Sequence, residues 1–258
     1  MKRILAVMAL GATCVAWGRI IELKTDSESC LVETRGAHIL SYRIGGEELL
    51  WSPWPLQLEG TEWQHGGIPI CWPAYGHDPA GLHGFAWKSE FTLVSKKMDG
   101  RKEVLTLSLE NAGHRLEYQI SIGNGLELTF TTINDAREPF AFSEAFHPYF
   151  LVGERDQCTI YGATPEPLVV NRALDDGFAV SLDANSARYR MVDGKMGRAI
   201  VVESENSPRM NIWNPGDWLE GWRSFVCVEP CISRRAPITL PPGKRHVMKM
   251  AVRKEGVK

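Results

Sequence analysis

The chain has 258 residues, of which 44% are hydrophobic, and this supplies enough apolar material for one large core. Its 29 Lys and Arg residues stand against 31 Asp and Glu residues, for a formal net charge of −2. That balance argues against nucleic acid or an anionic membrane surface as the partner. Composition therefore predicts a soluble globular domain and does not narrow its function further.

The N-terminus differs from the rest of the chain. Two basic residues at positions 2 and 3 precede an uncharged, largely apolar run over residues 4–16. The run is too short to span a bilayer and is typical of a secretory signal peptide, with Cys14 and Ala16 at the −3 and −1 positions of a cleavage site. The alternatives are a first β-strand and a lipid anchor at Cys14, for which Leu10 lies one residue too far upstream. We expect residues 1–17 to direct export to the periplasm or beyond; without a leader the protein is cytoplasmic.

Five cysteines remain once the leader is removed, so at least one thiol is unpaired within the chain. They are Cys30, Cys71, Cys158, Cys227 and Cys231. Cys227 and Cys231 are too loosely spaced from the histidines for a zinc motif. We therefore predict no structural metal.

Short alternating runs follow in chain order. They cover residues 30–33, 38–43, 91–95, 104–109, 198–203, 210–213, 225–229 and 246–252, mostly separated by Gly, Pro, Asn or Asp. The clearest pair covers residues 116–122 and 126–130, joined by Gly123-Asn124-Gly125, and it predicts an antiparallel hairpin. No stretch keeps a helical apolar period over three turns. The pattern predicts an all-β fold, a large antiparallel β-sandwich, with one domain over residues 18–258.

Two long segments interrupt the strands. Residues 62–89 carry several Gly-rich or Pro-rich turns, and residues 163–190 are polar and irregular in pattern. Loops of this length in a compact domain are usually functional or mobile.

Among the seven histidines, His147 has a distinctive context, because it ends an apolar run and precedes Pro148. Glu229 has the same sequence context, because it lies at the end of an apolar strand and precedes Pro230. The residue before a proline is held extended, which fixes the direction of its side chain. An acid at the end of an apolar strand is costly unless it is paired or lies at a cleft, where its pKa can rise toward that of a general base. The simpler alternative is a His and a Glu that merely face water.

Five motifs occur in the order found in the hexose-6-phosphate 1-epimerases, a branch of the aldose 1-epimerase superfamily. They are Gly66-Gly67-Ile68-Pro69-Ile70-Cys71-Trp72-Pro73, His83-Gly84-Phe85-Ala86, His147-Pro148-Tyr149-Phe150, Trp213-Asn214-Pro215 and Val226-Cys227-Val228-Glu229-Pro230. The chain resembles this family from about residue 20 to residue 252. The family fold is a large antiparallel β-sandwich of the galactose mutarotase-like type, in agreement with the strand pattern.

The resemblance implies that His147 is the general acid and Glu229 the general base of a mutarotase, with His83 as a donor to sugar oxygens. Mutarotation takes a proton from the anomeric hydroxyl and delivers one to the ring oxygen, so that the ring opens and can reclose on the other face. A carboxylate and an imidazole suit both directions. No cofactor is expected, because neither electrons nor groups are transferred.

The phosphate-binding residues of the family are replaced. The family's Arg before Gly-Gly-Ile-Pro is His65 here, and its Gln and Arg around His-Gly-Phe-Ala are Leu82 and Trp87. Neither Leu nor Trp can make the bidentate phosphate contacts of Arg. A family acid in the later irregular segment has Asp183 as its nearest candidate, although Ser186 aligns better. We expect Trp87 to stack on a sugar face.

These departures predict a mutarotase for an unphosphorylated aldose, with a small-molecule sugar as its partner. Two alternatives stay open. One is a glucose-6-phosphate 1-epimerase in which Lys88, Arg43 or Arg223 supplies the missing charge. The other is a non-catalytic carbohydrate-binding protein on the same fold, although such a protein needs no paired acid and base.

Overall fold

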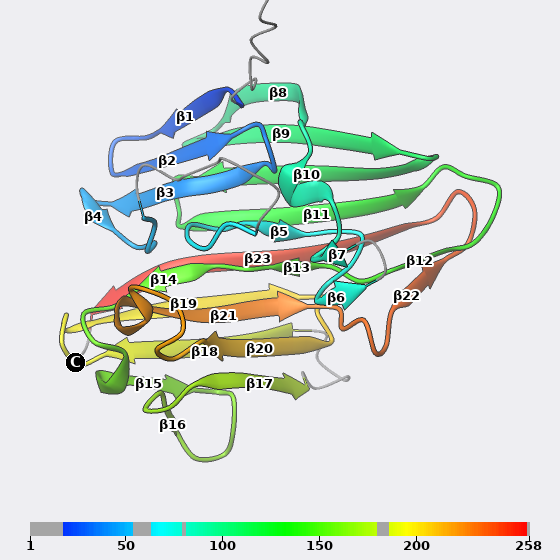
Figure 1. Cartoon of the computed structure of the whole chain (residues 1–258). Helices are drawn as coiled ribbons and strands as arrows, with labels where there is room; N and C mark the ends of the chain where they lie inside the picture. Colours follow the sequence, from blue (N-terminus) through cyan, green and yellow to red (C-terminus); the bar gives the residue numbers. More distant parts are fainter. Residues whose placement is uncertain (1–17, 54–62, 79–80, 180–185, 257–258) are drawn as a thin grey trace, which may run out of the picture.

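The computed structural model describes residues 18–53, 63–78, 81–179 and 186–256, and antiparallel strands dominate these residues (Figure 1). The largest sheet has nine strands, in the order β16 (Leu168–Val169), β15 (Cys158–Tyr161), β18 (Ser186–Asp193), β19 (Arg198–Glu205), β23 (Arg245–Gly256), β11 (Leu126–Asn134), β10 (His114–Ile122), β9 (Lys102–Asn111) and β8 (Thr92–Asp99). This sheet extends from one end of the molecule to the other.

Two smaller sheets lie against it. One contains β1 (Ile20–Lys24), β2 (Glu28–Glu33), β3 (His38–Ile44) and β4 (Glu47–Glu48). The other has the order β17 (Leu174–Ala179), β20 (Arg209–Asn214), β21 (Phe225–Cys231), β13 (Ala145–Phe146) and β5 (Ile70–Cys71), with β14 (Tyr149–Leu151) also paired to β21. The remaining elements are the pairs β12 (Phe140–Phe142) with β22 (Ile238–Leu240) and β6 (His77–Asp78) with β7 (Gly81–Leu82), and three short 3-10 helices, η1 (Ala86–Lys88), η2 (Arg155–Gln157) and η3 (Trp222–Ser224).

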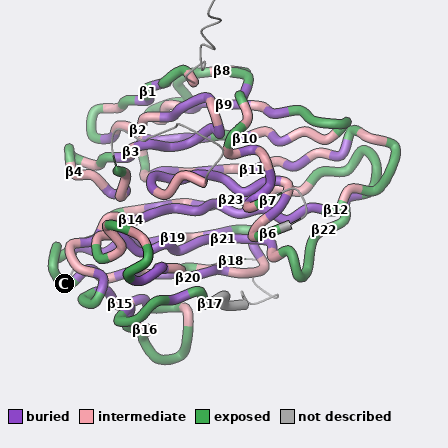
Figure 2. Tube along the Cα trace, viewed as in Figure 1, coloured by how far each residue is buried: buried purple, intermediate pink, exposed green. Residues whose placement is uncertain are grey.

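The core lies between these layers, and strands of the large sheet such as β9 and β11 alternate buried and more exposed residues. In β11 every second residue is buried, from Leu126 through Phe130 to Asn134, which is the two-residue period of a strand with one covered face. Figure 2 shows the buried positions in the strands of the central layers and the exposed ones at the turns. The predicted all-β sandwich is confirmed.

The predicted hairpin is β10 and β11, with Tyr118 opposite Phe130. Its turn glycines, Gly123 and Gly125, both have positive φ, at 124° and 88°, which glycine adopts without steric cost. Their backbone N–H groups donate to the carboxylate of Glu28, over 2.8 and 3.0 Å. A carboxylate from β2 thus fixes the turn to the neighbouring sheet.

The segment 163–190 is more regular than its pattern indicated, because it contains β16, β17 and the start of β18. In β18, Tyr189 and Met191 are buried while the residues between and before them are more exposed. The strand has only two large apolar side chains facing inward, and this weak signal made it resemble a loop.

Strand pairing brings the two strand-end motifs together. β14 pairs with β21 so that Tyr149 lies opposite Cys227. Two residues earlier on one strand and two later on the other are His147 and Glu229, which antiparallel geometry therefore places side by side.

Candidate active site

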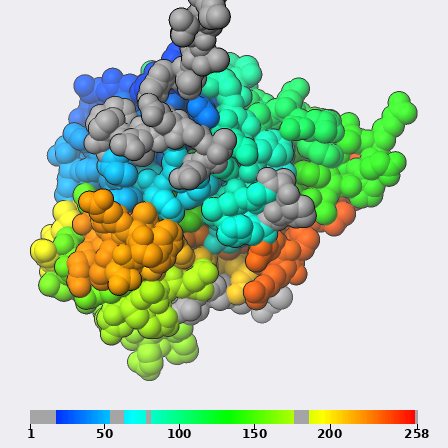
Figure 3. Space-filling model, viewed as in Figure 1, coloured from blue at the N-terminus to red at the C-terminus, as the bar shows by residue number. Residues whose placement is uncertain are grey.

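A cleft of about 580 Å³ opens on the six-stranded sheet, and His147 and Glu229 lie in its wall. Its other lining residues are Trp63, His65, Tyr75, Gly76, His77, Leu82, His83, Tyr149, Asp175, Arg209, Asn211, Trp213, Trp218, Cys231, Ser233, Arg234, Arg235 and Ala236. On the face seen in Figure 3, the cyan surface of residues 63–88 lies between the orange surface of the β20–β21 connection and the red-orange surface that follows β21. Segments distant in sequence therefore meet around one concavity.

The acid and base candidates are neighbours. His147 Nε2 lies 3.6 Å from Glu229 Oε1, and both side chains are almost fully buried. The His147 ring stacks on Tyr149 with centroids 4.9 Å apart and planes 13° apart, and its backbone N–H donates to the carbonyl of Pro69. These contacts fix the imidazole in the position that the residue before a proline was predicted to hold.

Tyr75 supports the carboxylate of Glu229 from the opposite side. Its hydroxyl donates to Glu229 Oε2 over 2.6 Å. Burial raises the pKa of Glu229 to about 8, although hydrogen bonds from Tyr75 and Asn211 act to lower this pKa. The result is a carboxyl group that exchanges its proton near neutral pH.

The imidazoles of the site are held in the neutral form. Burial lowers the pKa of His147 well below its ordinary value, and the nearby His83 and His65 lower it further. Burial also lowers the pKa of His83 to about 3. His83 Nδ1 accepts a hydrogen bond from the backbone N–H of Gly76 over 3.1 Å, so its proton is on Nε2. His83 is thereby prepared to donate to an oxygen in the cleft, the role expected for it.

One end of the cleft is aromatic and uncharged. His65 stacks on Trp213 with planes 7° apart and meets the edge of Trp218, and its Nδ1 lies 2.9 Å from the hydroxyl of Tyr149. Burial lowers the pKa of His65 to about 4, so the ring is neutral at physiological pH. Trp63 donates its indole N–H to the same Tyr149 hydroxyl. Where the resemblance expects an arginine, the chain has a neutral ring in an aromatic cluster.

Of the other site residues predicted from the sequence, one lines the cleft, one does not, and one lies outside the described residues. Leu82 lines the cleft, as expected of a residue next to the sugar. Trp87 does not line it: its indole N–H donates to the backbone carbonyls of Leu82 and Gly84, and its ring meets the edge of Trp63. Asp183 lies outside the described residues.

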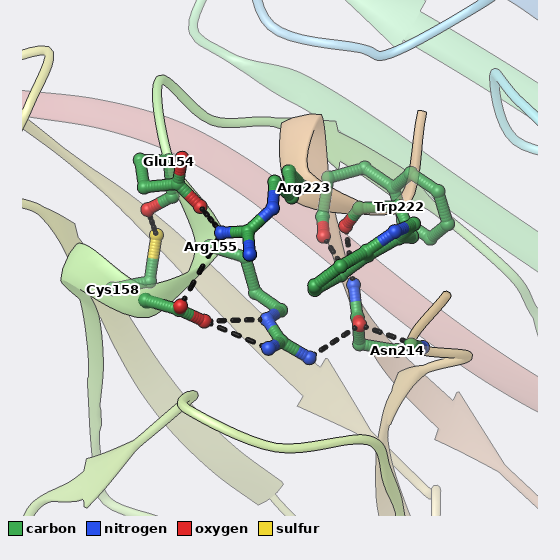
Figure 4. Close-up of polar contacts among 9 residues, drawn as sticks. Glu154, Arg155, Cys158, Asn214, Trp222 and Arg223 are labelled. Carbon is green, nitrogen blue, oxygen red and sulfur yellow. Dashed lines mark hydrogen bonds and ion pairs between the residues drawn. The ribbon is translucent and has the colours of Figure 1, made fainter. Parts of the chain in front are cut away.

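The basic residues proposed as a substitute phosphate clamp lie elsewhere. Arg43 pairs with Glu48, and Lys88 lies over the ring of Trp87, 5.4 Å from its centroid. Arg223 lies on the β20–β21 connection itself, in the cluster shown in Figure 4. Three other arginines, Arg209, Arg234 and Arg235, line the cleft instead.

The cluster in Figure 4 anchors the connection that carries Trp218 to the cleft. The ring of Trp222 packs between the guanidinium groups of Arg155 and Arg223, at 4.2 and 4.4 Å. Asn214 is its centre: its Oδ1 accepts from Arg155 and its Nδ2 donates to two carbonyls, of Trp222 and Phe225. Asn214 in the Trp213-Asn214-Pro215 motif thus has a local structural role, since both polar atoms of its amide are used.

Sequence reasoning did not find Tyr75, Asn211, Trp63 or the three arginines. Tyr75 follows Pro73 by two residues and has no local signal of its contact with Glu229, which is 154 residues away. Asn211 lies on β20 directly opposite Glu229, so a prediction of strand pairing would have found it.

The described residues contain one group with the donor set and spacing for a metal ion, formed by His147, Cys227 and Glu229. One ligand atom from each lies within 4.8 Å of the others. All five cysteines of the described chain are free, buried thiols. No helix among the described residues is long and apolar enough to cross a membrane.

A family model for aldose 1-epimerase matches residues 19–253. Relatives from Salmonella typhimurium and Escherichia coli, each named "Putative glucose-6-phosphate 1-epimerase", are 29% and 28% identical over 231 residues, covering 76% of this chain and 76% of each relative. The fold is shared with Slr1438 from Synechocystis, at a TM-score of 0.77 and 18% identity over 93% of this chain and 96% of that one. It is also shared with YeaD from Salmonella typhimurium, at 0.72 and 22% over 92% and 90%.

The sandwich has the fold of solved galactose mutarotase-like proteins. Within that class, the chain belongs to the aldose 1-epimerase family, and it is an isomerase. The family resemblance read from the five motifs is confirmed.

Proposed function

We propose that this protein interconverts the α and β anomers of an unphosphorylated aldose, with Glu229 and His147 as the catalytic base and acid. The observation that carries the proposal is the contact of these two side chains, 3.6 Å apart in the wall of a cleft. A cleft of about 580 Å³ is of the size of small-molecule sites. A binding module would have no use for two adjoining groups that exchange protons.

In the ring-opening step, Glu229 removes the proton of the anomeric hydroxyl while His147 gives a proton to the ring oxygen. The bond between C1 and the ring oxygen breaks, which leaves a free aldehyde. Rotation about C1–C2 exposes the other face, and reclosure returns both protons by the reverse path. His83 Nε2–H and the amide of Asn211 are placed to hold sugar hydroxyls, since both side chains line the cleft.

The pair carries one proton in every step of this cycle. In the empty cleft that proton is on Glu229, because burial favours the neutral forms of both groups. Ring opening begins with the proton on His147 and ends with it on Glu229. The proton therefore has to move from Glu229 to the adjoining His147 before the ring opens, and ring opening returns it to Glu229.

The substrate assignment rests on the aromatic end of the cleft. His65 is neutral and stacked on Trp213, and Trp87 uses its N–H on backbone carbonyls. Neither position offers a guanidinium group, whose two parallel N–H donors and positive charge suit a phosphate group. Aromatic rings such as Trp213 and Trp218 instead suit the apolar face of a sugar ring.

One observation favours a second candidate, epimerisation of glucose 6-phosphate. Arg209, Arg234 and Arg235 line the cleft, and two relatives are named for that substrate. Arg234 also donates to the carbonyl of His77, which places its guanidinium beside the loop of Tyr75. These arginines supply positive charge to the cleft that a phosphate group would meet.

The test is anomer interconversion of freshly dissolved α-D-glucose, α-D-galactose and glucose 6-phosphate, followed by polarimetry or proton NMR. We expect turnover of a free sugar, with a loss of about 10²- to 10⁴-fold in His147→Ala and Glu229→Ala. Clear preference for glucose 6-phosphate, abolished by Arg234→Ala with Arg235→Ala, would establish the second candidate. Binding of sugars without any acceleration would establish a carbohydrate-binding protein.

We further propose that the protein is exported, since residues 1–17 have the charge and length of a signal peptide. Phosphorylated hexoses are cytosolic, so an exported enzyme would meet free sugars. N-terminal sequencing of the protein from a periplasmic or culture fraction should begin near Trp17. An intact Met1 in the cytosolic fraction would contradict export without touching the mutarotase proposal.

A further inference from the structure

The catalytic pair has a third neighbour that mutarotation does not use. Cys227 lies on β21 two residues before Glu229, so both side chains point to the same face of the strand. The Cys227 Sγ, an imidazole nitrogen of His147 and a carboxylate oxygen of Glu229 all lie within 4.8 Å of one another. The three side chains are buried, at 0%, 5% and 0% exposure.

Two atoms of this cluster lack partners. Among the residues that the structure describes, neither Glu229 Oε1 nor His147 Nδ1 has a hydrogen-bond partner, although both atoms are buried. Glu229 Oε1 is the atom that faces His147 Nε2 at 3.6 Å. An unpartnered buried carboxylate oxygen beside an imidazole and a thiol is a preformed part of a metal-ligand set.

We propose that His147, Cys227 and Glu229 form a binding site for a thiophilic divalent cation such as Zn²⁺, and that the bound ion reversibly inhibits the enzyme. The statement about inhibition rests on the proposed function, whereas the statement about binding does not.

The donor set fits this class of ion. A sulfur, a nitrogen and an oxygen ligand, with the cleft as the open fourth position, are the ligand pattern of Zn²⁺ with three protein ligands. Bonds of about 2.0–2.3 Å require ligand atoms roughly 3.3–3.7 Å apart, so side-chain movements of about 1 Å complete the site. Hard cations such as Mg²⁺ prefer an all-oxygen set and are disfavoured by the thiol.

Charge balance also favours a divalent ion. Binding releases one proton from the Cys227 thiol and one from the Glu229 carboxyl group to solvent. The ion, the thiolate, the carboxylate and the neutral imidazole then sum to zero charge. A neutral group avoids the desolvation cost that a lone buried charge would incur. Because the ion occupies the acid and the base together, sugar cannot react while it is bound.

The binding experiment uses Co²⁺ as a spectroscopic probe on the full-length protein prepared free of metal. We expect one equivalent to bind with a thiolate-to-cobalt charge-transfer band, and Zn²⁺ to displace it. Cys227→Ser and His147→Ala should lose the band. Cys231→Ser is the matched control, because Cys231 is also buried on β21 next to Glu229 but is not in the ligand set, and it should keep the band.

Absence of the band in the wild type, or its persistence in Cys227→Ser, would overturn the site. X-ray absorption of the Zn²⁺-loaded wild type needs no variant: one sulfur per zinc at about 2.3 Å is expected, and no sulfur would overturn the proposal. Zn²⁺ should lower mutarotation at least tenfold, with recovery in EDTA. A normal cobalt band in a protein that never accelerates mutarotation would retain the metal site and reject the proposed function.

Discussion

The environment of Glu229 determines how the reaction responds to pH. Burial raises the pKa of this carboxyl group to about 8 and lowers the pKa of His147, so the pair holds one proton across the neutral range. Above pH 8 the proton leaves, and no acid remains to protonate the ring oxygen. We expect kcat/KM for mutarotation to be constant between about pH 6 and 8 and to fall about tenfold per unit above that range. Initial rates corrected for the buffer-catalysed reaction would show this, and a rate that rises above pH 8 would reject the one-proton pair.

Tyr75 acts through Glu229 as a positioning residue. Its hydroxyl donates over 2.6 Å to the carboxylate, and this hydrogen bond lowers the pKa of Glu229. In Tyr75→Phe we expect the alkaline fall in kcat/KM to move up by about one pH unit, since the charged form loses a donor. If the role of Tyr75 were purely structural, the substitution would change stability or KM but not the pH at which kcat/KM begins to fall.

The site residues that could be predicted from the sequence are those that have a recognisable local sequence pattern. His147 and Glu229 each precede a proline at the end of an apolar strand, and His83 lies in a glycine-flanked turn. Tyr75 has no such pattern, because its partner is 154 residues away and only the pairing of β5, β13 and β21 brings them together. For the same reason, the neutral state of His65 follows from its burial in the folded cleft and not from its place in a motif.

At the scale of elements, the connection between β20 and β21 depends on Asn214. This side chain accepts from the buried Arg155 and donates to the carbonyls of Trp222 and Phe225. Asn214→Ala leaves a buried guanidinium and two carbonyls short of partners, so we expect a loss of about 2–4 kcal/mol in the free energy of unfolding. The connection also carries Trp218, so KM for sugar should rise.

Urea unfolding measures this loss, and Asn111→Ala provides the control. Asn111 is at the exposed end of β9, where the same substitution should change stability by less than about 0.5 kcal/mol. Equal effects at the two positions would mean that the Asn214 contacts do not support the connection.

Strands with a strong alternation were predicted within two residues of their observed starts, as β10, β11 and β23 show, although β11 and β23 each continue four residues past the predicted end. The two-residue strands β5 and β13 were not predicted, because a run that short has no period to detect. These short strands nevertheless place Tyr75 and His147 beside Glu229. The general fold was therefore available from the sequence, whereas the arrangement of the cleft wall required the order of strands in the sheet.

At the scale of the whole molecule, a polar chain of contacts joins the two layers of the sandwich. Trp72 donates to the hydroxyl of Thr132 on β11, and Thr132 donates over 2.6 Å to Glu144, which directly precedes β13 of the facing sheet. Glu144 is fully buried, and the nearest cation candidate is His246, at 4.0 Å. A carboxyl group in this position is stable only with its proton, and burial raises its pKa to about 8.

This buried acid should make folding stability depend on pH. The pKa of Glu144 is near 4.5 in the unfolded chain and about 8 in the folded one. Its contribution to the free energy of unfolding is therefore complete below pH 4.5 and is lost as pH rises toward 8.

The substitution Glu144→Gln tests this, because it keeps the acceptor for Thr132 and removes the titration. We expect the variant and the wild type to have similar free energies of unfolding at pH 5, and the variant to be more stable at pH 8.5 by a few kcal/mol. Titration of Glu229 is common to both proteins and cancels in the difference, whereas titration of His246, 4.0 Å from Glu144, is coupled to the substitution. Urea unfolding at the two pH values decides the matter, since a difference that stays constant with pH would mean that Glu144 is already ionised in the folded protein.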